Sequence, residues 1–178
     1  MALLEEALPG LRPLEEEDLP QVLALYQSNP EYNALALDSP PTLETCREDR
    51  TDLPPGRLPE HKLFLGYFQG ERLAAVWDLV AGYPEESTLY LGLLELDGTQ
   101  QRQGLGSRLV RTLLSLGKEA GFAAVRLGCL EENRWGFAFW SKMGFTTEGR
   151  VPWKGDRMVL KMVRELEPQA CGNEGTAV

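Results

Sequence analysis

The sequence predicts an α/β domain built around a mixed β-sheet. Three observations lead to this prediction. The chain has 178 residues, 43% of them hydrophobic, which is enough for a sizeable core in one ordinary domain. A helical N-terminal part is followed by three short apolar segments that are separated by turn residues. The chain then alternates strand, helix, strand and helix before two last strands, which is the element order of an α/β domain.

The N-terminal part is expected to hold one strand and two helices. Residues 10–14 are predicted as a short first strand. Residues 15–27 have an amphipathic pattern with acidic side chains at its start, where they favour the helix dipole, and Asn29-Pro30 is expected to end this helix. A second, short helix is predicted over residues 42–52, inside a proline-rich stretch that covers residues 38–60.

The middle of the chain is expected to form three antiparallel strands. Residues 62–69 and 72–80 are predicted as a β-hairpin, because Gly70-Glu71 between them is a typical turn pair. The loop over residues 81–87 leads into residues 89–96. That run is short, apolar and bounded by turn residues, so it is predicted as a buried strand.

The second half is expected to complete the sheet with alternating helices and strands. After Gly104 one apolar face recurs at helical spacing, through Leu105, Leu109, Leu113, Leu116 and Ala120. The remaining elements are a strand over 123–130, a helix over 133–143, and strands over 145–150 and 157–164. Residues 1–166 are therefore predicted as a single domain, and the polar, glycine-bearing tail 167–178 is expected to be disordered.

The charge distribution excludes a nucleic-acid-binding protein. The net charge is −9, and residues 1–60 hold 13 acidic against 4 basic side chains, while residues 61–178 hold 14 of each. A protein that binds nucleic acid needs a basic face instead. The acidic N-terminal part could favour a cationic partner, although a solvated helix start explains the same residues.

Other sequence features argue against a membrane protein, a disulfide framework and a metal site. No apolar run approaches the roughly 20 residues of a membrane span, and the glutamates near the N-terminus do not suit a secretory signal, so a cytoplasmic location is expected. Cys46, Cys129 and Cys171 are widely spaced and are expected to be free thiols. They form no CxxC pair, so no metal site is predicted, and His61, the only histidine, gives a histidine-based triad little support.

The strand-to-helix turn QRQGLGS, residues 101–107, is the strongest candidate for a ligand site. A helix start presents unsatisfied N–H groups and the positive end of its dipole, so it readily holds an anion, and glycine lets the ligand approach the backbone. The turn lacks the Gly-Lys-Ser/Thr of a Walker loop and the third glycine of a dinucleotide fingerprint. Residues 101–118 carry four cations and no acid, namely Arg102, Arg108, Arg111 and Lys118.

A second pattern follows about 30 residues later in NRWGFAFWSKMGF, residues 133–145. Asn133 suits a helix N-cap, and Gly144 suits the left-handed position after a helix. Together with Gln-x-x-Gly-x-Gly in the preceding turn, this pattern resembles the GNAT superfamily of N-acetyltransferases over residues 11–164. The first 60 residues match in layout more than in motif.

The resemblance implies a fold and a way to bind acetyl-CoA. The sheet would be largely antiparallel and splayed between two parallel strands, here 89–96 and 123–130, with helices on both sides. Acetyl-CoA would lie in the gap, its pyrophosphate held by backbone amides of the turn and its pantetheine arm paired with the edge of strand 89–96. The implied contact residues are Leu94, Leu96, Gln101, Arg102, Gln103, Gly104, Leu105, Gly106, Ser107 and Asn133.

The implied reaction is direct attack of an amine on the thioester, and here the chain departs from the family. Trp140 stands where many relatives carry a tyrosine acid, and it can equally be a core residue. Strict alternation along strand 89–96 places Tyr90 on the face of Leu94 and Leu96 and turns Glu95 away. The candidates for proton transfer are Trp140, Tyr90, Glu86, Glu85, Asp78 and a water chain, and those for the acceptor pocket are Tyr32, Asp78 and Tyr83.

Three readings of the function remain open from the sequence alone. The first is an acetyl-CoA-dependent N-acetyltransferase that acts on a primary amine, such as a cationic small molecule, an amino acid or a peptide, without a metal. The second is a non-catalytic sensor of CoA or acyl-CoA on the same fold. The third is a scaffolding domain whose glycines only turn the chain. The sequence decides neither the acceptor nor whether the chain forms a homodimer.

Overall fold

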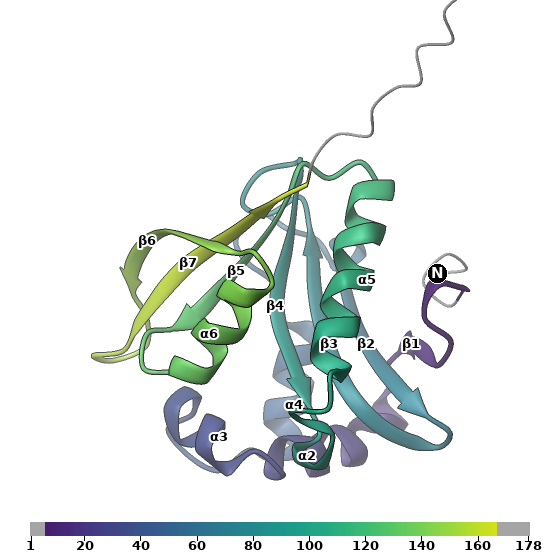
Figure 1. The fold of residues 1–178 in the computed structure, drawn as a ribbon. Helices are drawn as coiled ribbons and strands as arrows, with labels where there is room; N and C mark the ends of the chain where they lie inside the picture. Colours follow the sequence, from purple (N-terminus) through teal and green to yellow (C-terminus); the bar gives the residue numbers. More distant parts are fainter. Residues whose placement is uncertain (1–5, 167–178) are drawn as a thin grey trace, which may run out of the picture.

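The computed structural model describes residues 6–166 and confirms the predicted mixed α/β fold. Seven strands form one sheet in the order β1-β2-β3-β4-β5-β7-β6, in which only the β4–β5 pair is parallel (Figure 1). Strand β7 lies between β5 and β6. The last two strands, β6 and β7, therefore form a hairpin, and β7 is the strand that pairs with β5. The predicted tail, residues 167–178, lies outside the described residues.

The N-terminal part contains one helix more than expected. Asn29-Pro30 does end the first long helix, as predicted, but Pro30 also begins a second helix. A proline suits the first helical position because its missing N–H would have no partner there. The elements of this part are β1 (Leu11–Pro13), a 3-10 turn η1 (Glu16–Asp18), α2 (Leu19–Gln27), α3 (Pro30–Ala36), α4 (Leu43–Thr51) and η2 (Pro59–His61).

The remaining elements follow the prediction to within a few residues. The strands are β2 (Lys62–Gln69), β3 (Arg72–Ala81), β4 (Thr88–Leu96), β5 (Ala124–Leu130), β6 (Thr146–Pro152) and β7 (Met158–Glu165). Between them lie η3 (Gly98–Gln100), α5 (Leu105–Glu119) and α6 (Arg134–Lys142).

Helices cover both faces of the sheet, and each face has its own core. One face carries α5 and α6, and its core includes Trp77, Leu109 and Met162, with Trp140 packed against it. The opposite face carries α2 and α4, with Val22 and Cys46 in its core. Figure 1 shows α5 and α6 in front of the sheet and α4 fainter, behind it.

The parallel pair of strands separates part of the way along. The β4–β5 pairing begins at Thr88↔Ala124 and ends at Leu91↔Leu127. Beyond that point β4 continues to Leu96 against β3 alone, and β5 continues to Leu130 against β7 alone. The two strands therefore bound a V-shaped gap, which we call the opening, as the expected splay requires.

Candidate functional site

A β-bulge at the start of the opening reverses the faces of strand β4. Asp78 pairs with Leu93 and Leu79 with Leu91, so Gly92 between them has no partner on β3. Leu89 and Leu91 before the bulge and Leu94 and Leu96 after it all pack with the core under α5.

This bulge corrects one step of the sequence prediction. Strict alternation placed Tyr90 on the same face as Leu94 and Leu96, but the extra residue turns Tyr90 to the opposite face, toward α2 and α4. Glu95 lies on that face too, where its carboxylate contacts Asn29. The side chains of Tyr90 and Glu95 therefore share a face.

The predicted ligand turn has an unusual backbone. Arg102 has φ +58° and Gly104, which caps the start of α5, has φ +86°. Among residues 6–166, Arg102 is the one non-glycine residue with positive φ. Such a conformation costs on the order of 1–3 kcal/mol and is typical of functional sites. The turn also leads straight into the 15-residue helix α5, whose first amides have no partner within the helix, and a Cβ on Gly106 would lie 3.7 Å from the Leu96 side chain of β4.

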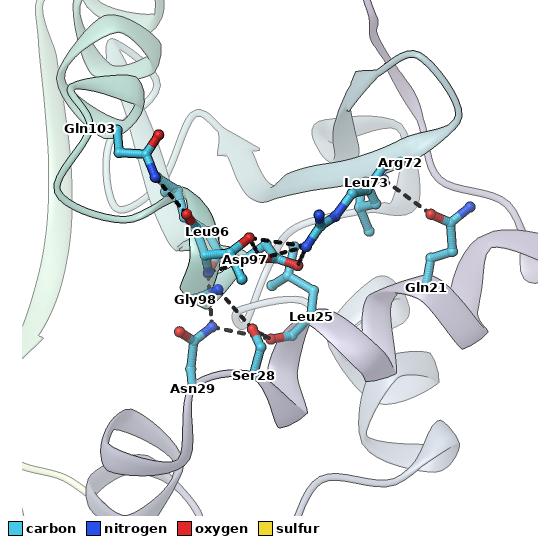
Figure 2. A network of polar contacts seen from close by, with 11 residues as sticks. Gln21, Leu25, Ser28, Asn29, Arg72, Leu73, Leu96, Asp97, Gly98 and Gln103 are labelled. Carbon is cyan, nitrogen blue, oxygen red and sulfur yellow. Dashed lines mark hydrogen bonds and ion pairs between the residues drawn. The ribbon is translucent and has the colours of Figure 1, made fainter.

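The side chain of Asn29 joins the turn to strand β4. Its Nδ2 donates to the carbonyl oxygen of Leu96 at 2.8 Å and to Glu95 Oε1 at 2.8 Å. Its Oδ1 accepts a hydrogen bond from Nε2 of Gln101, the first residue of the turn. Figure 2 shows Asn29 beneath Leu96, next to Ser28 and Leu25 at the end of α2. From the sequence, Asn29 is expected only to end the first helix.

Further hydrogen bonds hold the segment between β4 and the turn. The backbone N–H of Gly98 donates to Ser28 Oγ at 2.8 Å, and Arg72 Nη2 pairs with Asp97 Oδ2 at 3.0 Å (Figure 2). Gln103 Nε2 donates to the carbonyl of Thr99 at 2.7 Å. The turn is thus fixed to α2 and β3 by side chains on both sides.

Glu95 is a buried acid within this network. Its exposure is 8%, and burial raises its pKa from the ordinary 4.5 to about 8, an effect that the hydrogen bond from Asn29 only partly offsets. The carboxyl group therefore holds its proton at neutral pH. The sequence prediction had set Glu95 aside because it points away from Leu94 and Leu96.

The α6 side of the site is aromatic. Asn133 caps α6 by accepting from the Gly136 N–H at 2.8 Å, as its sequence position predicts. Trp140 makes edge contacts with Phe139 and Phe145, at centroid distances of 4.9 and 5.4 Å. A Cβ on Gly106 would lie 3.4 Å from the Phe139 ring, so the start of α5 touches α6 here.

Two arginines of the turn region contact aromatic rings. The guanidinium of Arg102 lies 4.9 Å from the ring centroid of Trp135, whose side chain is 73% exposed. Arg108 lies over Tyr67 at 5.2 Å and donates to its hydroxyl at 2.5 Å. Both cations thus stand beside the first turn of α5, where they add positive charge to the helix dipole.

Most of the residues predicted for catalysis or acceptor binding gather on the other face of β4. Tyr83 packs edge-on against Tyr90 at 5.2 Å. Asp78 on β3 forms an ion pair with Lys62. Tyr32 on α3 is half-buried, and burial, followed by Glu95, Asp49 and Cys129, raises its pKa.

Glu86 stands apart from this group. Its carboxylate forms an ion pair with Arg57 Nη1 at 2.9 Å, and its side chain is 87% exposed in the loop before β4. The Glu86 side chain therefore faces solvent, where Arg57 offsets its charge.

Metal and membrane features can be assessed for residues 6–166. In that part, no three His, Cys, Asp or Glu side chains are arranged to hold a metal ion. Cys46 and Cys129 are buried free thiols, and burial raises the pKa of each to about 11. Within the same residues, none of the helices is long and apolar enough to cross a membrane.

Comparison with known proteins points to one family. The family model described as Acetyltransferase (GNAT) family matches residues 20–145. Among curated protein sequences, none matches the chain. The chain is similar in structure to an acetyltransferase from Thermus thermophilus, with a TM-score of 0.71 and 25% identity over 88% of this chain and 96% of that one.

Two further solved structures share the fold. The ribosomal-protein-S18-alanine N-acetyltransferase from Escherichia coli aligns with a TM-score of 0.66 and 21% identity over 92% of this chain and 96% of that one. The PaiA N-acetyltransferase from Thermoplasma acidophilum, solved in complex with coenzyme A, aligns with a TM-score of 0.62 and 21% identity, covering 87% and 97%.

Proposed function

The chain belongs to the acetyltransferase (GNAT) family, and from that premise we propose that it transfers an acetyl group from acetyl-CoA directly to a primary amine. The acceptor would be a small molecule, an amino acid or a peptide. One observation carries the proposal: the β4–β5 pairing ends at Leu91↔Leu127, and the turn with left-handed Arg102 and Gly104 lies beside the gap that follows. An extended thioester with a polyanionic end suits such a gap.

The donor would be held mainly by backbone groups. The amides of residues 101–107 would bind the pyrophosphate, with Arg102 as the nearest cation. The edge of β4 at Leu94 and Leu96 lacks a β5 partner, so it can pair with the pantetheine arm as an added strand would. Asn133 at the start of α6 would contact the arm from the other side.

The chemistry requires stabilisation of negative charge at two atoms. A backbone N–H of Leu94 or Leu96 would donate to the thioester oxygen as the tetrahedral intermediate forms. The departing thiolate has a pKa near roughly 8.5 and needs little help to leave. Burial raises the pKa of Tyr90, so its phenol stays protonated and can donate a hydrogen bond to the reacting centre. Trp140 can donate only through its indole N–H and does not release a proton.

The acceptor would enter on the face of β4 that carries Tyr90. Tyr32, Tyr83 and Asp78 would line its pocket. The carboxylate of Asp78 on this face would favour a cationic amine over an acidic one, although Lys62 offsets part of its charge.

A CoA-binding sensor is the second candidate, and two observations favour it. Tryptophan replaces the usual tyrosine at position 140, where it packs against Phe139 and Phe145, and Glu95, the one acid of strand β4, holds its proton at neutral pH. A sensor would bind acetyl-CoA without turning it over.

Calorimetry with CoA and acetyl-CoA tests the donor site. We expect Gly106→Trp to abolish binding, because its side chain would fill the opening beside Phe139. Ser115→Trp, on an exposed position of the same helix, is the matched control and should bind as the wild type does. Ligand at 100 times its dissociation constant should also stabilise the fold by about 2.7 kcal/mol. Absence of binding by the wild type would overturn the proposal.

Turnover with a panel of amines separates the enzyme from the sensor. The panel should contain putrescine, spermidine, lysine and a short peptide with a free α-amine, with release of free thiol as the readout. Acetyl transfer to at least one amine supports the enzyme. Acetyl-CoA binding without transfer to any of them supports the sensor.

A further inference from the structure

Two glycines mark the point where the opening begins. Gly92 and Gly128 directly follow Leu91 and Leu127, the last pair that joins β4 to β5. A Cβ on Gly92 would lie 2.7 Å from Asp78 Oδ2. A Cβ on Gly128 would lie 2.9 Å from Val159 Cγ1 and 3.4 Å from the Tyr90 hydroxyl. The absent side chains therefore leave room for two polar groups from neighbouring positions.

Asp78 reaches this point from strand β3. Its register partner is Leu93, so it stands beside the bulge at Gly92. Its side chain is 16% exposed, and Lys62 Nζ lies 2.9 Å from Oδ1. The lysine therefore engages Oδ1, while Oδ2 is the oxygen that lies toward Gly92.

The charged groups around Asp78 come from three elements. Lys62 on β2 favours the ionised form, while Asp49 and Asp52 from α4 and its C-cap disfavour it. Burial is the largest influence, and it raises the pKa of Asp78 above its ordinary 3.8. On β4, burial raises the pKa of Tyr90, and Tyr83 and Asp78 raise it further. A carboxylate in such surroundings is a stronger base than one in water.

We propose that Asp78 is the general base of the acetyl transfer, reaching the acceptor amine through the space that Gly92 leaves at the start of the opening. The inference rests on the proposed function, because it assigns a role within that reaction. The base would come from β3, the neighbour of β4 on the side away from β5.

The proton balance of this step is simple. The acceptor arrives as an ammonium ion and gives one proton to the Asp78 carboxylate. The neutral amine then attacks the thioester carbon, forming the C–N bond. When the C–S bond breaks, the second nitrogen proton passes to the thiolate, which leaves the amide and the free thiol of CoA. Asp78 returns its proton to water.

The other acidic candidates are less suited to this role. Glu95 holds its proton at neutral pH and accepts a hydrogen bond from Asn29. Glu86 is exposed and paired with Arg57. Asp78 combines closeness to the start of the opening with a second oxygen, Oδ2, which lies toward Gly92 and is not the one paired with Lys62.

The test compares Asp78→Asn with the wild type on the panel amine that turns over fastest. We expect kcat to fall on the order of 10²-fold at pH 7 with acetyl-CoA affinity unchanged. The rate of the variant should rise steadily with pH, because only the neutral amine now reacts. Its deficit should shrink with semicarbazide, a weakly basic amine that is neutral at pH 7 and needs no base.

Lys62→Gln provides a second readout that does not remove the carboxylate. Loss of the cation raises the pKa of Asp78, so the acid limb of the kcat/KM profile should move to higher pH. A folded Asp78→Asn variant with the wild-type pH profile, or an unmoved acid limb in Lys62→Gln, overturns the inference alone. A wild type that acetylates no panel amine overturns the proposed function and the inference with it.

Discussion

The two ends of the opening both depend on glycine, but for different physical reasons. At the turn, Gly104 has φ +86° and nothing lies within 4 Å of its absent Cβ, so the residue is needed for its backbone conformation. At the start of the opening, Gly92 is needed for space, because Asp78 Oδ2 occupies the position of a Cβ. The first requirement is local and the second depends on a residue of another strand. Under the proposed function, the same residue type would serve donor binding at one end and acceptor chemistry at the other.

The largest expected effect is a loss of turnover on substitution of Gly92, the glycine at the start of the opening. In Gly92→Ala the new Cβ would meet Asp78 Oδ2 at 2.7 Å, so the carboxylate must turn away. We expect turnover to fall on the order of 10²-fold, the contribution of a general base, with acetyl-CoA affinity preserved. Steady-state kinetics and calorimetry on the same preparation measure both quantities.

Gly149→Ala is the matched control for this prediction. It adds the same methyl group to a strand glycine on β6, where only Lys161 Cε lies within 4 Å, at 3.9 Å. Its turnover should equal that of the wild type. Equal losses in the two variants would mean that any methyl group in the sheet impairs activity, and the contrast between the two ends of the opening would disappear.

The second effect concerns Glu95, whose partner Asn29 connects the turn to β4. Its pKa is 4.5 ordinarily and about 8 in the fold. Between pH 4.5 and about pH 8, the unfolded chain has therefore lost a proton that the folded protein keeps. Within this window the free energy of unfolding should fall as pH rises, by about 1.4 kcal/mol per pH unit from this group. Glu95→Gln should remove that slope, as measured by urea unfolding at several pH values.

Glu71→Gln is a useful comparison, because Glu71 is an exposed carboxylate in the β2–β3 turn. It should leave the pH dependence as it is in the wild type. If Glu95→Gln also leaves the slope unchanged, Glu95 does not hold its proton in the folded protein.

The smallest expected effect concerns Gly104, the glycine at the turn. Gly104→Ala places a side chain at φ +86°, which should cost about 1–2 kcal/mol of stability and weaken CoA binding. Gly56→Ala has the same kind of strain at φ +81° with nothing within 4 Å, but it lies far from the turn in sequence and outside the proposed site. It should lose similar stability and bind CoA normally. Denaturant unfolding and calorimetry of the pair separate conformational strain from loss of the ligand site.

The sequence allowed the turn, the helix α5 and most of the strands to be predicted, because each depends on neighbours a few residues away. Periodic leucines identify α5, and Gly70-Glu71 identifies the hairpin between β2 and β3. The side-chain direction of Tyr90 could not be predicted, since one unpaired residue at Gly92 reverses the alternation. The residue pattern of one strand does not indicate an unpaired residue, because a bulge is defined by the register with the partner strand.

Two parts of the candidate site also required the folded chain. Asn29 and Gln101 are 72 residues apart, and only the packing of α2 against the end of β4 brings their side chains together. Helix α3 was missed because Asn29-Pro30 suits a helix end and a helix start equally well. Proline both follows helix ends and occupies the first position of helices, so the sequence does not distinguish the two when one helix ends just before another begins.

The amide of Asn29 would couple the two proposed substrate sites. The segment that carries α2 and α3 would shape the acceptor pocket, yet its central asparagine also fixes Leu96 and Gln101, where the donor is proposed to bind. A change in this segment that alters the choice of amine will therefore tend to alter the Michaelis constant for acetyl-CoA as well. Directed evolution of a new acceptor should hold position 29 constant and draw its diversity from the outward-facing positions of α3.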